Sequence, residues 1–193
     1  TTGGVNTAIG YRSLKSNTVG TSNTALGYFS LQANVQGTGS VAIGAHALGQ
    51  SNPATASNMN NTAVGTSAGQ EITTGTNNVI IGYQTADAMT TGSGNTIIGY
   101  DANPSSNSAS NQTVIGNGAT GHGNNKITLG NASVTNIEPG ADSAVDLGSS
   151  SYTFKAVYSD SFVSGTDSSD VRFRQFDGNE CARMHDGGTT QSD

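Results

Sequence analysis

The chain has 193 residues but no tryptophan, a single cysteine and only 10% charged residues. The lone Cys181 excludes an internal disulfide framework. The sequence contains no apolar run near the ~18 residues of a membrane-spanning helix and no signal-peptide pattern. The net charge is −6 and the basic residues form no cluster, which argues against nucleic-acid binding and membrane insertion.

Hydrophobic residues are also scarce, at 33% of the chain. Disordered chains share this scarcity, but they are normally also highly charged, which this chain is not. Glycine, asparagine, serine and threonine fill the sequence instead, and they recur in a regular order. This composition predicts a thin repetitive fold with a narrow core, in which contact between chains supplies part of the stability.

A short phrase of the form Asn-Thr-Ala-Ile-Gly returns eight times up to residue 130. Its glycines are spaced 17, 17, 21, 17, 17, 17 and 14 residues apart. A period this short indicates one structural unit stacked on itself, and about 17 residues with an apolar, β-branched strand phrase suit one coil of a solenoid. We therefore expect an all-β fold, a parallel β-solenoid over residues 1–136. The phrase ends at the turn glycines Gly10, Gly27, Gly44, Gly65, Gly82, Gly99, Gly116 and Gly130.

Strand alternation divides the phrase into an inner and an outer column. The residue before the glycine is never polar, so the sequence predicts that it forms the structural core. This expected core column is Ile9, Leu26, Ile43, Val64, Ile81, Ile98, Ile115 and Leu129. The preceding, outward column is small or apolar and carries no charge, so another subunit should cover it and the working unit should be a homotrimer. That expected outward column is Ala8, Ala25, Ala42, Ala63, Ile80, Ile97, Val114 and Thr128.

Two further features concern the turns. A second glycine, such as Gly20 or Gly75, precedes the phrase glycine by seven residues in most repeats, and it predicts a left-handed turn there.

The 21-residue interval between Gly44 and Gly65 predicts a four-residue insertion rather than a lost coil. Pro53 cannot donate to a strand ladder, so the insertion should bulge over residues 50–55.

The chain changes character near residue 135. Three acidic residues precede this point and ten follow it, and the repeat stops after Gly130. Residues 137–193 should therefore form a separate β-region, small and intertwined between chains, held by aromatic side chains between Tyr152 and Phe176. Residues 171–180 alternate around Asp177-Gly178, which predicts a hairpin.

The repeated phrase resembles the head repeats of YadA-like trimeric autotransporter adhesins over about residues 1–134. The resemblance implies a left-handed parallel β-roll with three chains side by side. The sequence departs from the pattern in its longer period, in its frequent threonine two residues before the isoleucine, and in the insertion near residues 51–60.

A second phrase, Asp146 to Tyr158, resembles a segment of bacteriophage tail-fibre and tailspike proteins. Together the two resemblances imply a structural, host-attachment component of a virion fibre at the virion surface. Its partners would be two further copies, other tail or baseplate proteins, and a glycan or protein receptor on the host. The alternative is the head of a bacterial trimeric autotransporter adhesin at the bacterial cell surface.

No residue pattern predicts catalysis, a metal site or a cofactor. Asp87 and Asp101 are out of register on neighbouring coils, so they do not form the carboxylate pair of a glycan-cleaving enzyme. His46, His122 and His185 are far apart and lack ligand spacing. The lack of a carboxylate pair disfavours a depolymerase, and an ice-binding solenoid needs a flat Thr-x-Thr array that the phrase does not have.

Tyrosine directly follows the phrase glycine in four repeats. Stacked tyrosine rings could bind sugar rings, or they could form a ladder at a corner or a subunit contact. The sequence favours the packing role and leaves both open. The residues of this possible glycan or interface ladder are Tyr11, Tyr28, Tyr83 and Tyr100.

Overall fold

The computed structural model describes residues 2–135, 137, 151, 171–174, 180–184 and 190–191. The chain divides into two compact units, Thr1–Asn136 and Ile137–Asp193. The described residues contain β-strands and turns and no helix, so none of them forms a helix that could cross a membrane. The fold class is therefore all-β.

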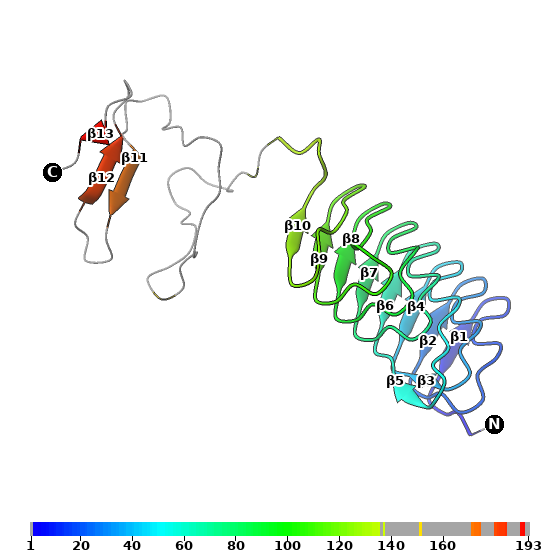
Figure 1. The fold of residues 1–193 in the computed structure, drawn as a ribbon. Helices are drawn as coiled ribbons and strands as arrows, with labels where there is room; N and C mark the ends of the chain where they lie inside the picture. Colours follow the sequence, from blue (N-terminus) through cyan, green and yellow to red (C-terminus); the bar gives the residue numbers. More distant parts are fainter. Residues whose placement is uncertain are drawn as a thin grey trace. The chain divides into compact units, whose positions relative to one another are not determined.

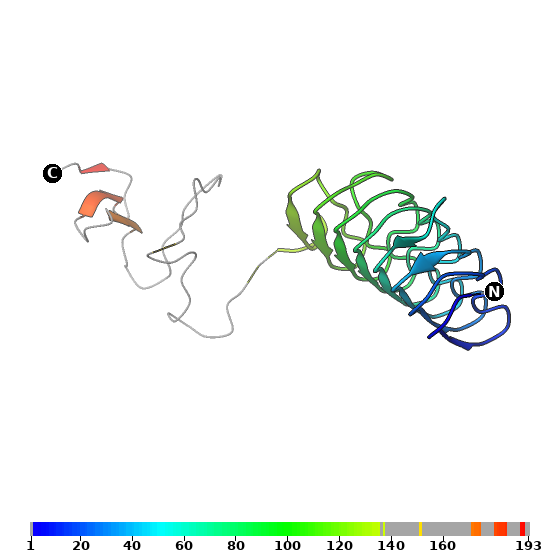
Figure 2. The same ribbon diagram turned by 90° about the horizontal axis from the view of Figure 1, so that it is seen from below.

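The first unit is a parallel β-solenoid (Figure 1). Each glycine phrase forms one three-residue strand, and the strands lie side by side in chain order along one side of the stacked coils (Figure 2). The eight strands of this sheet are β1 (Thr7–Ile9), β2 (Thr24–Leu26), β4 (Val41–Ile43), β6 (Thr62–Val64), β7 (Val79–Ile81), β8 (Thr96–Ile98), β9 (Thr113–Ile115) and β10 (Ile127–Leu129).

The strands pair with equivalent phrase positions opposite each other. Thr7 lies opposite Thr24, Ala25 opposite Ala42, and Ile81 opposite Ile98. Because every strand has the same register, each phrase position becomes a straight column that runs the length of the sheet.

The predicted core column is wrong, because the residue before each glycine faces outward. Ile9 is 58% exposed and Ile81 is 38% exposed, and the other members of the column are half-buried or exposed. The middle residue of the strand points inward instead. Its members from β2 to β9 are fully buried: Ala25, Ala42, Ala63, Ile80, Ile97 and Val114.

The narrow interior explains this inversion, because large side chains from the opposite wall already occupy it. In the early coils the inward strand residue is alanine, and Leu31 and Leu48 fill the space. In the later coils the strand supplies Ile80 and Ile97, the leucine column becomes Gly69 and Ala86, and Ile72 and Met89 are also buried. Gly69 lies where the two patterns meet, since a Cβ there would be 2.9 Å from Ile72 Cδ1 and 3.0 Å from Ile80 Cδ1. The core is thus filled by size complementarity across the coil.

The phrase glycines combine a left-handed backbone with close coil-to-coil contact. Gly82 has φ +139°, and a Cβ there would collide with the carbonyl oxygen of Gly99 in the next coil. All eight turn glycines have positive φ: Gly10, Gly27, Gly44, Gly65, Gly82, Gly99, Gly116 and Gly130. A side chain at any of the first seven positions would both strain the turn and push the coils apart, whereas at Gly130 it would collide with Val134.

The glycine seven residues before the phrase glycine was predicted to have a left-handed backbone, and this prediction is wrong in most repeats. Gly20 and Gly75 lack positive φ, but a Cβ on either would collide with the glycine carbonyl of the next coil. Close approach therefore explains these glycines. The left-handed position lies two residues later, in a column that is mostly asparagine and glycine: Val5, Ser22, Gly39, Asn60, Asn77, Gly94, Asn111 and Asn125.

The insertion bulges as predicted, and residues 50–55 lie outside the strands. Gln36 donates a hydrogen bond to the carbonyl oxygen of Pro53, 17 residues later, which is the regular spacing between coils. Gly37 in β3 (Gly37–Thr38) instead pairs with Ser57 in β5 (Ser57–Asn58), 20 residues later. Three of the four extra residues are therefore the exposed residues 54–56. The fourth lies after Asn58, where the added Met59 is buried.

The first residue of the phrase is usually a buried asparagine, and these side-chain amides form a ladder along the stack of coils. Asn78 donates through Nδ2 to the carbonyl oxygen of Gly92 at 2.8 Å, and its Oδ1 accepts from the backbone N–H of Asn95 at 2.9 Å. Asn61 and Asn95 make the same two kinds of bond with their neighbouring coils. These side chains therefore satisfy backbone groups inside the stack that the strands do not reach.

The second unit contains an antiparallel sheet of β11 (Val171–Arg174), β12 (Glu180–Met184) and β13 (Thr190–Gln191). β11 and β12 pair antiparallel, with Arg174 opposite Glu180 and Val171 opposite Met184, so the second strand extends beyond the predicted hairpin of residues 171–180. Apart from Ser151, the Asp146–Tyr158 phrase lies outside the described residues, as do the aromatic residues Tyr152 to Phe162.

Candidate functional site

The turn that follows each strand carries the exposed rings of the solenoid. Tyr11 and Tyr28 stack with ring centroids 5.6 Å apart, and Tyr83 and Tyr100 stack at 5.5 Å. All four rings are about half exposed or more. The four tyrosines therefore form two separate ladders, because Ala45 and the threonine of the next coil interrupt the column.

The residues beside the first ladder extend it into an aromatic patch that the sequence analysis missed. Phe29 stacks on His46 at 5.3 Å with ring planes 3° apart. Phe29 also meets Tyr28 edge-on at 4.1 Å and Tyr11 at 5.7 Å. We call Tyr11, Arg12, Tyr28, Phe29 and His46 the aromatic patch. The signal in the sequence was the adjacent column, which holds arginine, phenylalanine and histidine in successive repeats.

A cation completes the aromatic patch. The Arg12 guanidinium carbon lies 5.2 Å from the Tyr11 ring centroid and 5.4 Å from that of Phe29. These distances allow cation–π attraction to two rings at once. The guanidinium is thereby held against the rings while the residue remains exposed.

The backbone at this column is left-handed, with φ of 58° at Arg12 and 59° at both Phe29 and His46. Bulky residues in this region cost on the order of 1 kcal/mol or more each. The same column holds Gly118 at φ 59°, which has no such cost. The turn therefore requires the conformation but not the rings.

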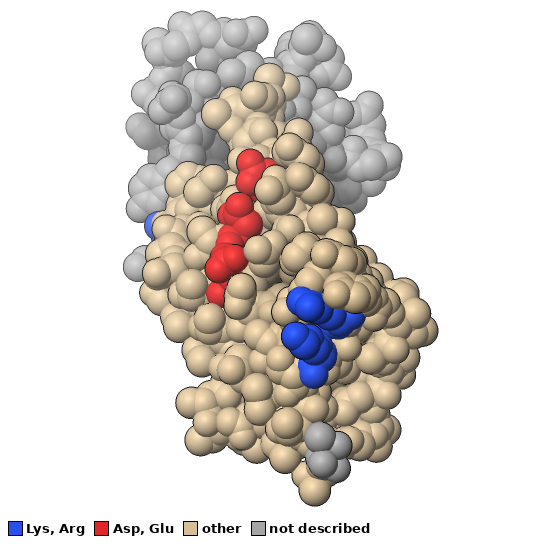
Figure 3. All heavy atoms as spheres, turned by 90° about the vertical axis from the view of Figure 1, so that its right-hand side faces the viewer, with Lys and Arg blue, Asp and Glu red and all other residues tan. Residues whose placement is uncertain are grey.

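Charge is distributed unevenly over the solenoid. Arg12 and Lys15 lie in the first turn and are exposed, whereas the acidic residues of the solenoid are Glu71, Asp87 and Asp101 on later coils. Figure 3 shows a blue basic patch separated from a red acidic stripe. The Asp101 carboxylate accepts a hydrogen bond from Asn103 Nδ2 at 3.0 Å, and it lies beside the second tyrosine ladder. The two ladders thus differ in the charge next to them.

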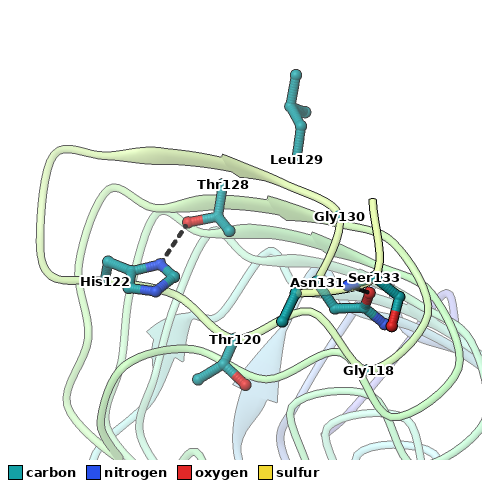
Figure 4. Close-up of a pocket in the computed structure, with 9 residues that line it drawn as sticks. Gly118, Thr120, His122, Thr128, Leu129, Gly130, Asn131 and Ser133 are labelled. Carbon is teal, nitrogen blue, oxygen red and sulfur yellow. Dashed lines mark hydrogen bonds between the residues drawn. The ribbon is translucent and has the colours of Figure 1, made fainter. Parts of the chain in front are cut away.

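An open hollow of about 700 Å³ lies at the last coil (Figure 4). In its lining, His122 Nδ1 and Thr128 Oγ1 are in hydrogen-bond contact at 3.4 Å, while Leu129 points away. Its lining includes Thr120 but no acidic side chain. Within the described residues no group of three histidine, cysteine or acidic side chains could hold a metal ion.

The chain matches no protein-family model, no curated protein and no solved structure. Evidence for function therefore comes from the geometry of the solenoid and from the exposed turns that follow its strands.

Proposed function

We propose that the chain is a structural and host-attachment component of a virion fibre, such as a bacteriophage tail fibre, and that it works as a homotrimer. One observation carries the proposal. The outer face of the eight-stranded sheet carries a column of isoleucine, leucine and valine beside a column rich in threonine, has no charge, and is uncovered in the single chain.

This face is built from the first and third residue of each strand. Val79 and Ile81 on β7, and Ile127 and Leu129 on β10, are exposed. No strand residue of the sheet is charged. A continuous column of exposed and half-buried aliphatic side chains of this kind normally marks a contact with another protein. The inward column proposed from the sequence to need cover is instead buried within its own coil, so the outward isoleucine column takes over that role.

A thin coil favours association for a second reason. Its interior is narrow, and alanine supplies many of the buried residues. Covering the outer face with identical chains would add apolar burial that the coil cannot provide for itself. The resemblance to YadA-like heads supports three further points: that three chains associate, that the roll is left-handed, and that the chains lie side by side.

The assignment to a virion rests on the Asp146–Tyr158 phrase, since a bacterial adhesin head would share the solenoid. Other tail or baseplate proteins and a host receptor would then be the partners. The stacked, repetitive solenoid of the first unit suits a role in spacing and attachment.

The test is the mass of the whole chain in solution, measured by sedimentation and light scattering. The unmodified chain should have three times the mass of one chain. Ile81→Asp should reduce this to one, because an unpaired carboxylate buried at the contact costs several kcal/mol. The variant should stay folded by circular dichroism, because Ile81 is already 38% exposed in the single chain.

Thr74→Asp is the matched control, since Thr74 is an exposed turn residue outside the sheet. It should leave the mass unchanged. A folded, monomeric unmodified chain would refute the proposal.

A further inference from the structure

We propose that the aromatic patch binds a pyranose sugar that carries a carboxylate, such as a uronic or sialic acid, on the host surface. The inference rests on the proposed attachment function and specifies the receptor's chemistry. It also assigns the site to the first three coils of the solenoid.

The ring arrangement suits a saccharide. Tyr11 and Tyr28 present stacked, half-exposed rings on successive coils, and Phe29 and His46 continue the surface beside them. A pyranose has one face of C–H groups that packs against such rings, and its hydroxyl groups remain in water. The tyrosine hydroxyls supply polar groups at the same surface.

Fold requirements do not explain the rings. The tyrosine column holds Ala45 in the third coil, and the neighbouring column holds Gln84 in a later coil with φ 50°. The same turn therefore forms with small or polar residues. In the aromatic patch the chain instead places Arg12, Phe29 and His46 in a left-handed conformation that disfavours them.

The charge of the site selects an acidic sugar. Arg12 lies over two of the rings, and Lys15 is exposed in the same turn. A guanidinium binds a carboxylate through two parallel hydrogen bonds, so a ligand stacked on the rings would place its carboxylate there. A nucleic acid fits poorly, because the chain has a net charge of −6 and offers only these two cations at the site.

The second ladder provides an internal comparison. Tyr83 and Tyr100 stack at 5.5 Å with ring planes 12° apart, close to the geometry of the first ladder. Gln84 and Asp101 occupy the positions that Arg12 and Phe29 hold in the aromatic patch. An acidic sugar should therefore bind the first ladder and be repelled from the second.

The experiment is calorimetric titration of the whole chain with three probes: a glucuronic-acid trisaccharide, sialyllactose and neutral lactose. At least one acidic probe should bind at least about tenfold more tightly than lactose, the ratio that corresponds to one charge-assisted contact. Arg12→Gln should remove this preference, and Tyr28→Ala should abolish binding. Both replacements occur naturally at the same columns, as Gln84 and Ala45, so both variants should fold.

Tyr100→Ala is the matched control and should leave binding of the acidic probe unchanged. The proposal is overturned if neither acidic probe binds, if Arg12→Gln keeps the preference, or if Tyr100→Ala weakens binding as much as Tyr28→Ala. Each variant's mass is measured alongside. A Tyr28→Ala chain that loses its assembly would show that the rings form a subunit contact instead. A monomeric unmodified chain that still binds the acidic probe would refute the trimer and leave this site intact.

Discussion

At the scale of single residues, the amide ladder holds neighbouring coils together in the buried interior. Asn78 is fully buried and its side chain makes four hydrogen bonds, donating to Asn61 and Gly92 and accepting two from Asn95. Asparagine suits this position because it carries both donors and an acceptor on a short side chain. Ser40 occupies the same position in the third coil, where it accepts only a 3.4 Å contact from the backbone N–H of Asn61.

We predict that Asn78→Ala destabilises the chain by about 3 kcal/mol. The change leaves the Gly92 carbonyl and the Asn95 N–H buried without these partners, and each such group costs about 1–3 kcal/mol. Chemical denaturation with circular dichroism measures the loss. Asn107→Ala, at an exposed turn residue, should change stability by less than about 0.5 kcal/mol. Equal effects of the two changes would show that the ladder has no special role.

At the scale of the coil, an insertion is tolerated where it leaves the register of the main sheet intact. Residues 54–56 leave the stack as an exposed loop, and β4 and β6 still pair in register, with Ala42 opposite Ala63. Met59 differs from them, because it is 1% exposed and its Cγ would lie 2.9 Å from a Cβ on Gly37. One insertion thus has a dispensable part and a packed part.

We predict that deleting residues 54–56 changes stability by less than about 1 kcal/mol, because shortening a surface loop changes its closure entropy only slightly. Met59→Ala should cost about 2–5 kcal/mol through lost burial and a cavity. Denaturant midpoints of the whole chain compare the two. The division of the insertion is wrong if the deletion costs more than Met59→Ala.

At the scale of the whole molecule, the solenoid is a one-dimensional stack. Each coil contacts only the coils before and after it, so the end coils have one neighbour and the central coils have two. The three residues of β1 are all exposed, whereas Ile80 and Ile97 in β7 and β8 are fully buried. Protection should therefore rise from the ends toward the centre.

We predict that amide hydrogen exchange of β7 and β8 is at least about tenfold slower than that of β1, since 1.4 kcal/mol of extra local stability produces this factor. Mass-spectrometric exchange on the intact chain resolves the strands. Uniform exchange across all coils would indicate a single cooperative unit and contradict the stack.

The sequence alone determined the architecture of the first unit. A glycine every 17 residues, between apolar β-branched residues, requires short strands in the same register, and the 21-residue interval marked the insertion. These features are local and periodic, so they follow from spacing and from the conformational freedom of Gly82 and its equivalents.

Only the tertiary structure decided which side of each strand faces inward. A three-residue strand such as Val79–Ile81 is apolar at every position, so alternation allows either face to be the inner one. The choice depends on what the opposite wall contributes, and there Leu48 and Met89 leave room for one inward residue per strand. The aromatic patch was hidden for the same kind of reason. Phe29 and His46 lie in a different column from the tyrosines, and only the path of the turn brings their rings together.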